Sequence, residues 1–534
     1  MGQTLLIAVI TLIFALPLLS IGAHLLSGGA WPSTLSLYVL NTVLLMAAVG
    51  LISALIGVSC AWLISAYEFP GRKWLSWALV LPIAAPAYII AYVYADLLEF
   101  YGPVQTSMRH IFSWEQSDYW FPSIRNLAGA ALMLSFVLYP YIYLLARASF
   151  LTQSQSQWWA ARNLGLSARQ ACFKVVLPTA RPAIAGGTAL VMMETLADFG
   201  VADFFAVPTF SVGIFRNWLI IGDKAAAMKL ASVMLLAVIL LITIETSTRR
   251  GTVANNDKTL GRVAPARLAG GRAFATTLIC FLPVLIGLII PCLRLGYFAL
   301  VEGDGQSLRH LFAYAKNSFV LALIVGALAL MIAVFLAYRK RTHPSKLLKS
   351  SIRLSTLGYA LPGALLAVGL LSPLAWADQR FSKMISALFG GSPGLIITGT
   401  ILALVYALCV RFLTVAFNTI EAGFSKIPAS MEHASRSLGA HWLRRMRLIV
   451  LPLLRPSLIS AFILVFIDVM RELPATLIMR PFNFDTLATR VYWLASDERL
   501  SEASTAALII IIIGILPTLY LNAFVTKQGG ENKG

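Results

Sequence analysis

Long apolar stretches recur along the chain and are separated by short polar segments. Windows of about 20 apolar residues, the length of a helix that crosses a bilayer, predict six spans in each half of the sequence. The predicted spans lie near residues 5–26, 40–66, 74–98, 127–151, 183–206 and 225–246, and near 274–294, 316–338, 354–377, 393–417, 457–479 and 505–526. This pattern predicts an all-α integral membrane protein with about twelve transmembrane helices.

The charge distribution indicates how these spans are oriented. The chain is 59% hydrophobic and 12% charged, with a net charge of +19, whereas soluble domains carry about 25% charged residues. When Lys and Arg are sorted by alternate loops, 27 of the 42 fall on one side of the membrane. The positive-inside rule makes that side cytoplasmic and places both termini there. The excess of basic residues is therefore explained by the orientation of the protein in the membrane. We expect a lipid membrane as a partner and no nucleic acid.

One twenty-residue stretch occurs twice. Residues 163–182 read NLGLSARQACFKVVLPTARP, and residues 437–456 read SLGAHWLRRMRLIVLPLLRP, 274 residues further on and without a gap. Both copies fall in loops predicted to be cytoplasmic. A paired motif at constant spacing indicates an internal duplication.

The duplication extends over the whole chain. Asn41-Thr42 opens the second predicted span and Asn317-Ser318 the eighth, while Pro86 corresponds to Pro362. Because six crossings return the chain to the same side, the halves are parallel repeats. We expect a first six-helix repeat at 1–246, a cytoplasmic linker at 247–273 and a second six-helix repeat at 274–534. The first span, whose leading residues MGQT carry no Lys or Arg, is expected to be a retained helix and not a cleaved signal.

Each copy of the repeated stretch combines small residues, a glycine and a Leu-Pro pair. The glycine predicts a turn between two short helices. The Leu-Pro pair is expected to end the second helix, and the following Arg-Pro to begin the next membrane helix. We therefore expect a helix–turn–helix projecting into the cytoplasm. The alternative is a basic loop lying on anionic lipid headgroups, which the presence of two copies at fixed spacing disfavours.

This motif resembles the EAA loop of permease subunits in binding-protein-dependent ABC importers. The matching positions are Ala160, Ala161, Gly165, Leu177 and Pro178 in the first copy and Ala434, Ser435, Gly439, Leu451 and Pro452 in the second. Trp159 and His433 stand where the family often has Glu, so an acidic contact there is in doubt. The resemblance implies that each loop docks on a separate cytoplasmic ATPase subunit and transmits its closure. Two loops imply two ATPase copies.

No nucleotide site is readable in the chain itself. It lacks GxxxxGK[ST], and its histidines and cysteines show no metal-ligand spacing. No Ser/His/Asp or Cys/His arrangement is readable either. We expect a transport subunit that is not an enzyme and holds no cofactor, with ATP and Mg²⁺ bound by the partner ATPase.

Residues 194–231 and 468–504 carry a more specific resemblance. With the rest of the chain, they look like the fused two-half permeases of ferric-iron ABC importers of the bacterial inner membrane. The resemblance implies that a periplasmic binding protein delivers ferric iron, which crosses by alternating access. Thiamine or polyamine transport by the same class is the alternative, and a gradient-driven secondary transporter is a second class.

Four acids in these two segments recur at the repeat spacing. Glu194 aligns with Asp468, and Asp198 aligns with Glu472. Each pair is spaced i, i+4, so we expect both carboxylates to share one helix face near mid-membrane, where a charge is costly and should face a wet interior. Together with Arg471 they predict an acid-lined path, in which Glu194 and Asp468 contact Fe³⁺ transiently and hold no stable metal. The alternative is that these acids pair with Arg471 or with neighbouring helices and close a gate.

Overall fold

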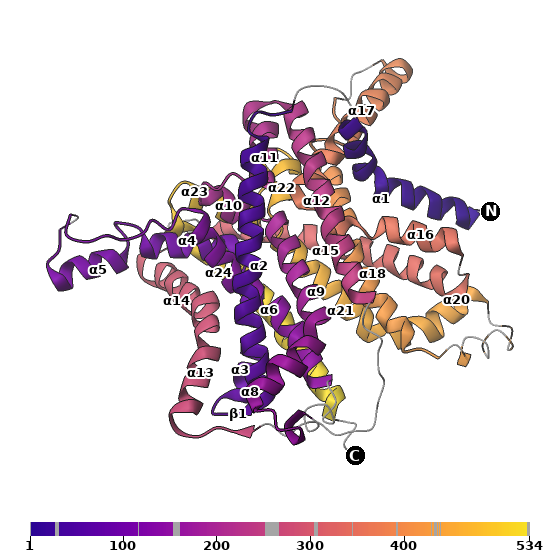
Figure 1. Cartoon of the computed structure of the whole chain (residues 1–534). Coiled ribbons are helices and arrows are strands. Elements are labelled where there is room, and N and C mark those ends of the chain that lie inside the picture. The colour runs from indigo at the N-terminus through magenta and orange to yellow at the C-terminus, as the bar shows by residue number, and fades with distance from the viewer. Residues whose placement is uncertain are drawn as a thin grey trace. The chain divides into compact units, whose positions relative to one another are not determined.

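The structure, a computed structural model, is almost entirely helical over the residues it describes (Figure 1). These are residues 2–26, 31–115, 117–152, 161–250, 266–303, 308–343, 345–390, 394–428, 430–431, 435, 437, 439 and 441–530. Within them, β-structure is limited to a parallel pair, β1 (Tyr67–Glu68) with β2 (Ala266–Arg267). The chain divides into two compact units.

The helices account for the predicted spans. Among the described residues, nine helices are long and apolar enough to cross a membrane, and two bent helix pairs raise that number to eleven. The twelfth predicted span corresponds to α24 (Leu500–Gly530), whose described apolar part runs from Leu500 to Leu516. The all-α membrane architecture is therefore confirmed.

One unit comprises residues 33–213, 236–305 and 491–534. Its core is formed by α2, α6 and α9, which pack closely because small residues face the neighbouring backbones. A Cβ added at Gly57 would lie 2.9 Å from the carbonyl oxygen of Tyr139, and one at Gly187 would lie 2.9 Å from the Cα of Ile142. The helices and turns of this unit are α2 (Leu35–Ala66), α3 (Arg72–Ala78), η1 (Leu81–Ala84), α4 (Ala87–Leu98), α5 (Pro103–Phe112), α6 (Leu127–Thr152), α8 (Ala168–Ala171), η2 (Cys172–Val176), α9 (Leu177–Ala197), α10 (Gly200–Phe204), α13 (Gly270–Val284), η4 (Leu285–Ile289), α14 (Ile290–Tyr297), η5 (Phe298–Glu302) and α24.

The other unit comprises residues 1–32, 214–235 and 306–490. Its core repeats the same arrangement with α15, α18 and α21, and Gly326 faces Phe462 where Gly50 faces Thr188 in the first core. Its elements are α1 (Gly2–Leu26), η3 (Arg216–Ile221), α15 (Leu308–Thr342), α16 (Lys346–Ser355), η6 (Gly358–Ala360), α17 (Gly363–Phe389), α18 (Ile401–Ser425), α20 (Trp442–Arg445), η7 (Met446–Val450), α21 (Leu451–Met470) and α22 (Pro474–Met479). Three helices contribute to both units: α11 (Phe210–Phe215), α12 (Lys224–Arg250) and α23 (Leu487–Ser496).

Each unit contains helices from both halves of the sequence. In the unit built on the second half, α1 packs against α16 and α17, and the Ser232 hydroxyl of α12 donates to the Ile21 carbonyl at 3.2 Å. In the unit built on the first half, α13 packs on α2 and α3, and α24 packs on α4 and α14. The units in space therefore differ from the predicted segments 1–246 and 274–534, which remain predictions about repeats along the sequence. Residues 251–265 of the predicted linker lie outside the described residues.

The third and ninth spans are each broken at a proline. The helices on either side of Pro86 are bent by 92°, and those on either side of Pro362 by 119°. Both prolines are extended, with ψ of 133° and 142°, as expected where a ring removes a backbone donor and clashes with the preceding turn. The correspondence predicted between these two prolines thus marks the same structural break in each half.

Candidate functional site

The first copy of the repeated stretch folds as a helix end followed by a turn. Gly165 has a φ of +84°, its N–H donates to the Arg162 carbonyl at 3.1 Å, and the Leu166 N–H donates to the Ala161 carbonyl at 3.2 Å. These two bonds form a Schellman motif, in which a glycine in the left-handed region satisfies the last carbonyls of a helix. The predicted glycine turn is therefore present.

A new helix begins directly after this turn. The Gln170 N–H donates to the Ser167 hydroxyl at 3.2 Å, and the Ser167 N–H donates to the Gln170 side chain at 2.9 Å. This is a capping box, which satisfies two free donors at a helix start. The helix runs through α8, the π turn η2 and α9 without leaving the helical region.

The second copy repeats this order of elements. Gly439 has a φ of +70°, and α20, the π turn η7 and α21 follow it. In both copies a five-residue π turn ends directly before the Leu-Pro pair. Ala160 and Ala434 lie outside the described residues, whereas Ala161 and Ser435 are both buried.

The expectation that Leu-Pro ends a helix and Arg-Pro begins the next one is wrong. Pro178 and Pro182 both lie within α9, and Pro452 and Pro456 both lie within α21. The helix tolerates Pro178 and Pro452 because the adjoining π turn can accommodate the ring and the missing donor, and the Thr179 hydroxyl donates to the Val175 carbonyl at 2.7 Å. The fifth and eleventh spans consequently begin inside the repeated stretches and end earlier than predicted, at Ala197 and Met470.

A carboxylate caps a short helix at the end of each of these spans. Asp198 Oδ2 accepts from the N–H groups of Val201 and Ala202 in α10, at 3.2 and 3.1 Å. Glu472 accepts from the N–H groups of Ala475 and Thr476 in α22, both at 2.9 Å. The two acids therefore play equivalent parts, each using its charge to stabilise the positive end of a helix.

The expectation that each pair of acids shares one helix face is wrong for the same reason. The helix ends between the two members of each pair, since α9 ends at Ala197 and α21 ends at Met470. Glu194 remains on α9 and is half-buried. Asp468 remains on α21 and forms an ion pair with Arg471, with 2.5 Å between Oδ1 and Nη2.

The cap in the second half is part of a buried ion-pair cluster, which we call the Glu472 junction. It consists of Gly363, Arg411, Glu472, Ala475 and Thr476. Arg411 Nη1 lies 3.2 Å from Glu472 Oε1, and the two side chains are 14% and 2% exposed. A Cβ at Gly363 would lie only 2.2 Å from Arg411 Nη1, so the break after Pro362 and the break after α21 meet at this ion pair.

Hydroxyl groups hold the next helix in both halves. The Phe210 N–H at the start of α11 donates to the Thr42 hydroxyl at 3.2 Å. The Leu487 N–H at the start of α23 donates to the Ser318 hydroxyl at 2.8 Å. The predicted match between Asn41-Thr42 and Asn317-Ser318 therefore corresponds to equivalent hydrogen bonds from α2 and α15.

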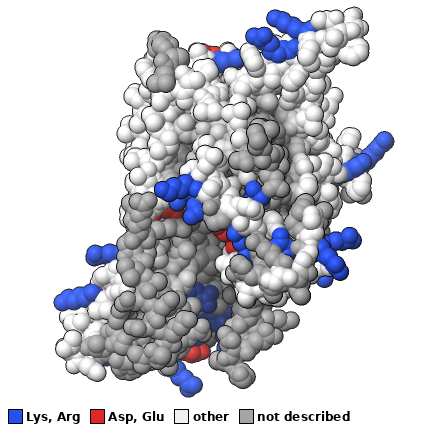
Figure 2. Space-filling view, turned by 90° about the vertical axis from the view of Figure 1, so that its right-hand side faces the viewer, with Lys and Arg blue, Asp and Glu red and all other residues white. Residues whose placement is uncertain are grey.

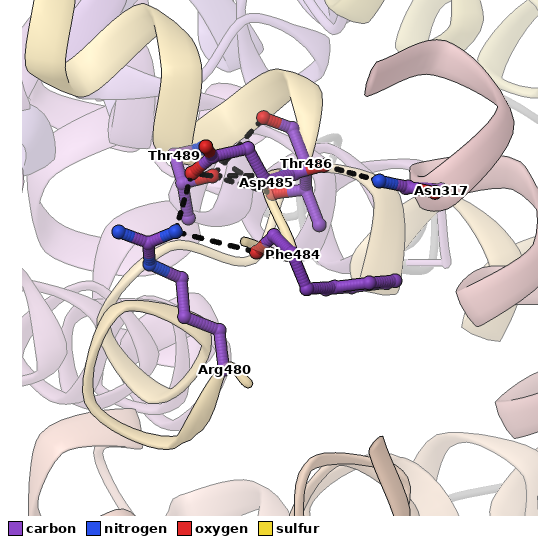
Figure 3. Close-up of polar contacts among 6 residues, drawn as sticks. All are labelled: Asn317, Arg480, Phe484, Asp485, Thr486 and Thr489. Carbon is purple, nitrogen blue, oxygen red and sulfur yellow. Dashed lines mark hydrogen bonds and ion pairs between the residues drawn. The ribbon is translucent and has the colours of Figure 1, made fainter. Parts of the chain in front are cut away.

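The loop between α22 and α23 is closed by a polar cluster (Figure 3). Arg480 Nη1 contacts Asp485 Oδ1 at 2.6 Å, and the Thr489 hydroxyl lies 3.4 Å from the same oxygen. The Asn317 amide donates to the Asp485 carbonyl at 3.0 Å, which ties the loop to α15. This loop contains the RPFNFD segment that carries the resemblance to ferric permeases.

Arg411 is the functional candidate that the sequence analysis missed. Its signal was available, because it is a lone cation within the apolar window 393–417, and charges at such positions are costly and are retained for a role. The hydrogen bond from Tyr492 to Asp203, at 2.8 Å, had no comparable signal. Within the described part of the chain, no group of three or more His, Cys, Asp or Glu residues is placed to hold a metal ion.

Comparison with known proteins identifies the class to which this arrangement belongs. Residues 53–250 and 329–528 both match the family described as "Binding-protein-dependent transport system inner membrane component". The chain belongs to this family, with one match in each half. It is thus a multi-pass membrane permease subunit of an ABC importer, a transport component that works with an ATPase and a periplasmic binding protein.

Particular relatives extend over most of the chain. It is 24% identical to the "Fe(3+)-transport system permease protein FbpB 2" of Haemophilus influenzae, over 91% of this chain and 90% of the relative. It is 23% identical to the "Ferric transport system permease protein FbpB" of Actinobacillus pleuropneumoniae, over 91% of this chain and 70% of the relative. A "Sulfate transport system permease protein CysT" from Salmonella typhimurium is 28% identical over only 38% of this chain.

Proposed function

We propose that this permease moves ferric iron from a periplasmic binding protein into the cytoplasm by alternating access. The observation that carries the proposal is the match to ferric permeases over 91% of the chain. The similar sulfate permease covers 38% of it, as a single half-sized unit would. Thiamine or polyamine import by the same class is the competing proposal.

The two repeated stretches are the proposed docking sites for two ATPase copies. Support comes from their shared construction, since each places a glycine turn and a π turn ahead of a membrane helix. A push on either turn is transmitted along α9 or α21 because the helix is continuous. ATP and Mg²⁺ would be bound by the ATPase, and this chain would hold no cofactor.

The proposed iron path uses the acids at the ends of α9 and α21. Glu194 and Asp468 would contact the cation transiently, because carboxylate oxygens suit a hard cation, and Arg471 would restrain Asp468 between passages. Asp198 and Glu472 would hold the helix breaks beside them, since their oxygens already accept backbone N–H groups. A path of this kind releases its cargo, so no stable metal site is required.

We propose that both termini lie in the cytoplasm, as the distribution of Lys and Arg suggests. A reporter that fluoresces only in the cytoplasm, fused to residue 534, should give signal. An alkaline phosphatase fusion at the same position should be inactive. The reverse pair of results would invert the proposed orientation.

Reconstituted transport tests the function directly. The permease is placed in liposomes with its co-purifying ATPase, and the binding protein is supplied loaded with Fe³⁺. We expect ATP-dependent iron uptake, which Glu194→Ala together with Asp468→Ala should abolish while the complex still assembles. Glu302→Gln, at an exposed acid outside residues 194–231 and 468–504, serves as the control and should transport normally.

Each outcome of this assay separates one proposal from another. Iron uptake that persists in the double variant would reject the acid path and keep the substrate. Uptake of thiamine or a polyamine, with no iron uptake, would replace the substrate and keep the class.

A further inference from the structure

A cavity of about 540 Å³ lies between α1, the end of α15 and α16, within a single unit of the structure. Its volume is within the range of roughly 300–1,000 Å³ that encloses a small organic molecule. None of its fourteen lining residues is acidic. They are Ile7, Ala8, Thr11, Leu12, Ala15, Leu18 and Leu19 of α1, with Arg339, His343, Ser345, Leu347, Leu348, Ser351 and Leu354.

The walls of this cavity are suited to hydrocarbon. Leu12 is 61% exposed and Leu347 is 70% exposed, so the protein leaves most of their apolar surface uncovered. Exposed apolar surface is costly in water, but it is matched by acyl chains in a bilayer. The cavity therefore favours an occupant with a long apolar part.

One end of the cavity carries a cation, Arg339, that forms no ion pair with an acid among the described residues. The last turn of α15 holds three consecutive basic residues, of which Lys340 pairs with Glu421 and Arg341 donates to the carbonyls of Phe424 and Ile427. Arg339 instead lines the cavity, where its Nη1 lies 3.4 Å from His343 Nδ1. Its Nε is buried and, among the described residues, has no hydrogen-bond partner. An anion in the cavity would balance the charge of this guanidinium.

Helix α16 adds positive charge beside the same end. Ser345 caps it by accepting from the Leu348 N–H at 3.1 Å. Leu348 and Ile352 are buried on one face, whereas its basic residues Lys346, Lys349 and Arg353 are exposed. An amphipathic helix with a basic face is typical of the membrane interface. Figure 2 shows basic side chains in several groups, with few acidic ones, on the face it draws.

We propose that this cavity binds one anionic phospholipid. An acyl chain lies between α1 and α16, and the phosphate accepts hydrogen bonds from Arg339 and the Ser345 hydroxyl. Basic pockets between membrane helices on the cytoplasmic side bind anionic headgroups in this way. The lipid contacts both α1 of the first repeat and α16 of the second. It therefore stabilises the packing of these two helices in the unit that they share.

The test measures lipid bound to the purified, delipidated full-length chain by native mass spectrometry. Phosphatidylglycerol and phosphatidylcholine with identical acyl chains are added in turn. We expect one phosphatidylglycerol to be retained about five-fold more strongly than phosphatidylcholine, the preference that one basic residue near a headgroup provides. Equal retention of the two lipids by the unaltered chain would overturn the proposal.

Variants locate the binding within the molecule. Arg339→Gln should lower phosphatidylglycerol to the level of phosphatidylcholine, and Arg339→Lys should keep most of the preference. Ala8→Trp, which fills the cavity from an exposed lining position, should reduce both lipids. Arg380→Gln makes the same charge change at an exposed position of α17, outside the cavity lining, and should bind as the unaltered chain does.

Two further results would count against the site. The first is a preference for phosphatidylglycerol that is unchanged in Arg339→Gln. The second is displacement of the lipid by inorganic phosphate, which would mean that only a free anion is bound. Retention of the lipid at high phosphate concentration would support the proposal, because the acyl chain anchors it.

Discussion

At the residue scale, an ion pair and several hydrogen bonds converge on the Glu472 junction. Glu472 accepts hydrogen bonds from two backbone N–H groups and from the Thr476 hydroxyl while it pairs with Arg411. A buried ion pair of this kind contributes little beyond an apolar pair of equal volume, but breaking it leaves a charge without compensation. The ion pair between Arg411 and Glu472 therefore serves mainly to fix the positions of the two helix breaks that meet there.

Removing the cation alone should be strongly destabilising. Arg411→Met leaves Glu472 buried with only its hydrogen-bonding partners, and breaking a buried pair costs about 3–5 kcal/mol. We expect a lower midpoint of thermal unfolding for the detergent-purified chain. Adding Glu472→Gln to the same chain should recover part of the loss, because the charge is removed while the amide oxygen can still cap α22. A double variant less stable than Arg411→Met would contradict this explanation.

Gly363 should tolerate no side chain. Gly363→Ala would place a methyl group 2.2 Å from Arg411 Nη1 and 2.7 Å from Glu472 Oε1, so both charged groups must shift from their present positions. We expect poor membrane expression and a lower unfolding midpoint. Gly186→Ala is the matched control, since its Cβ would meet nothing within 4 Å and alanine favours the helix by about 0.5–1 kcal/mol. Equal effects of the two variants would show that the contact at Gly363 does not matter.

At the element scale, the repeated stretches illustrate what could and could not be predicted from the sequence. The glycine turn was predictable because the left-handed conformation at Gly165 and Gly439 is a local property of the residue. The continuation of α9 through Pro178 was not, because it depends on a π turn that local rules for proline omit. The same omission led to the wrong prediction that each acid pair shares one helix face. The prolines at 86 and 362 do break their spans. The presence of a proline therefore did not tell a broken span from a continuous one.

The left-handed glycines should be needed for coupling. Gly165→Ala and Gly439→Ala each force a Cβ into a conformation that costs roughly 1–2 kcal/mol, although the surrounding space is open. We expect each variant to lower iron uptake and the double variant to abolish it, with ATP hydrolysis no longer stimulated by the binding protein. Gly165→Asn should retain uptake, because Asn is accepted in this conformation. Full activity of the double alanine variant would show that the turn can be rebuilt.

At the scale of the whole molecule, the repeats along the sequence and the units in space do not coincide. Helix α1 belongs to the first half of the sequence, but it packs on α16 and α17 of the second half. Helices α13 and α24 belong to the second half, but they pack on helices of the first. Hydrophobicity identifies each span but carries no information on which neighbours it will choose, so this sharing of helices could not be predicted from the sequence.

Cutting the chain between the halves should test this sharing. Fragments 1–256 and 257–534, expressed together, should co-purify as an equimolar complex, because each completes a unit of the other. Fragment 1–256 expressed alone should not be a stable monomer, since its α1 lacks the surface on which it packs. Size-exclusion chromatography with multi-angle light scattering distinguishes these outcomes. A stable, monodisperse monomer of either fragment would show that each half folds independently.

The exchange of helices also bears on how such a chain can change over generations. A duplicated gene ordinarily frees one copy to diverge while the other preserves the original role. Here a substitution on α1 alters a surface that packs against α16 and α17. Whether such a change is tolerated in one half therefore depends on residues of the other half. Fusion into a single reading frame keeps those co-adapted residues together through recombination. It allows the halves to diverge, as at Arg411, whose counterpart 274 residues earlier is Val137, without either half losing its partner.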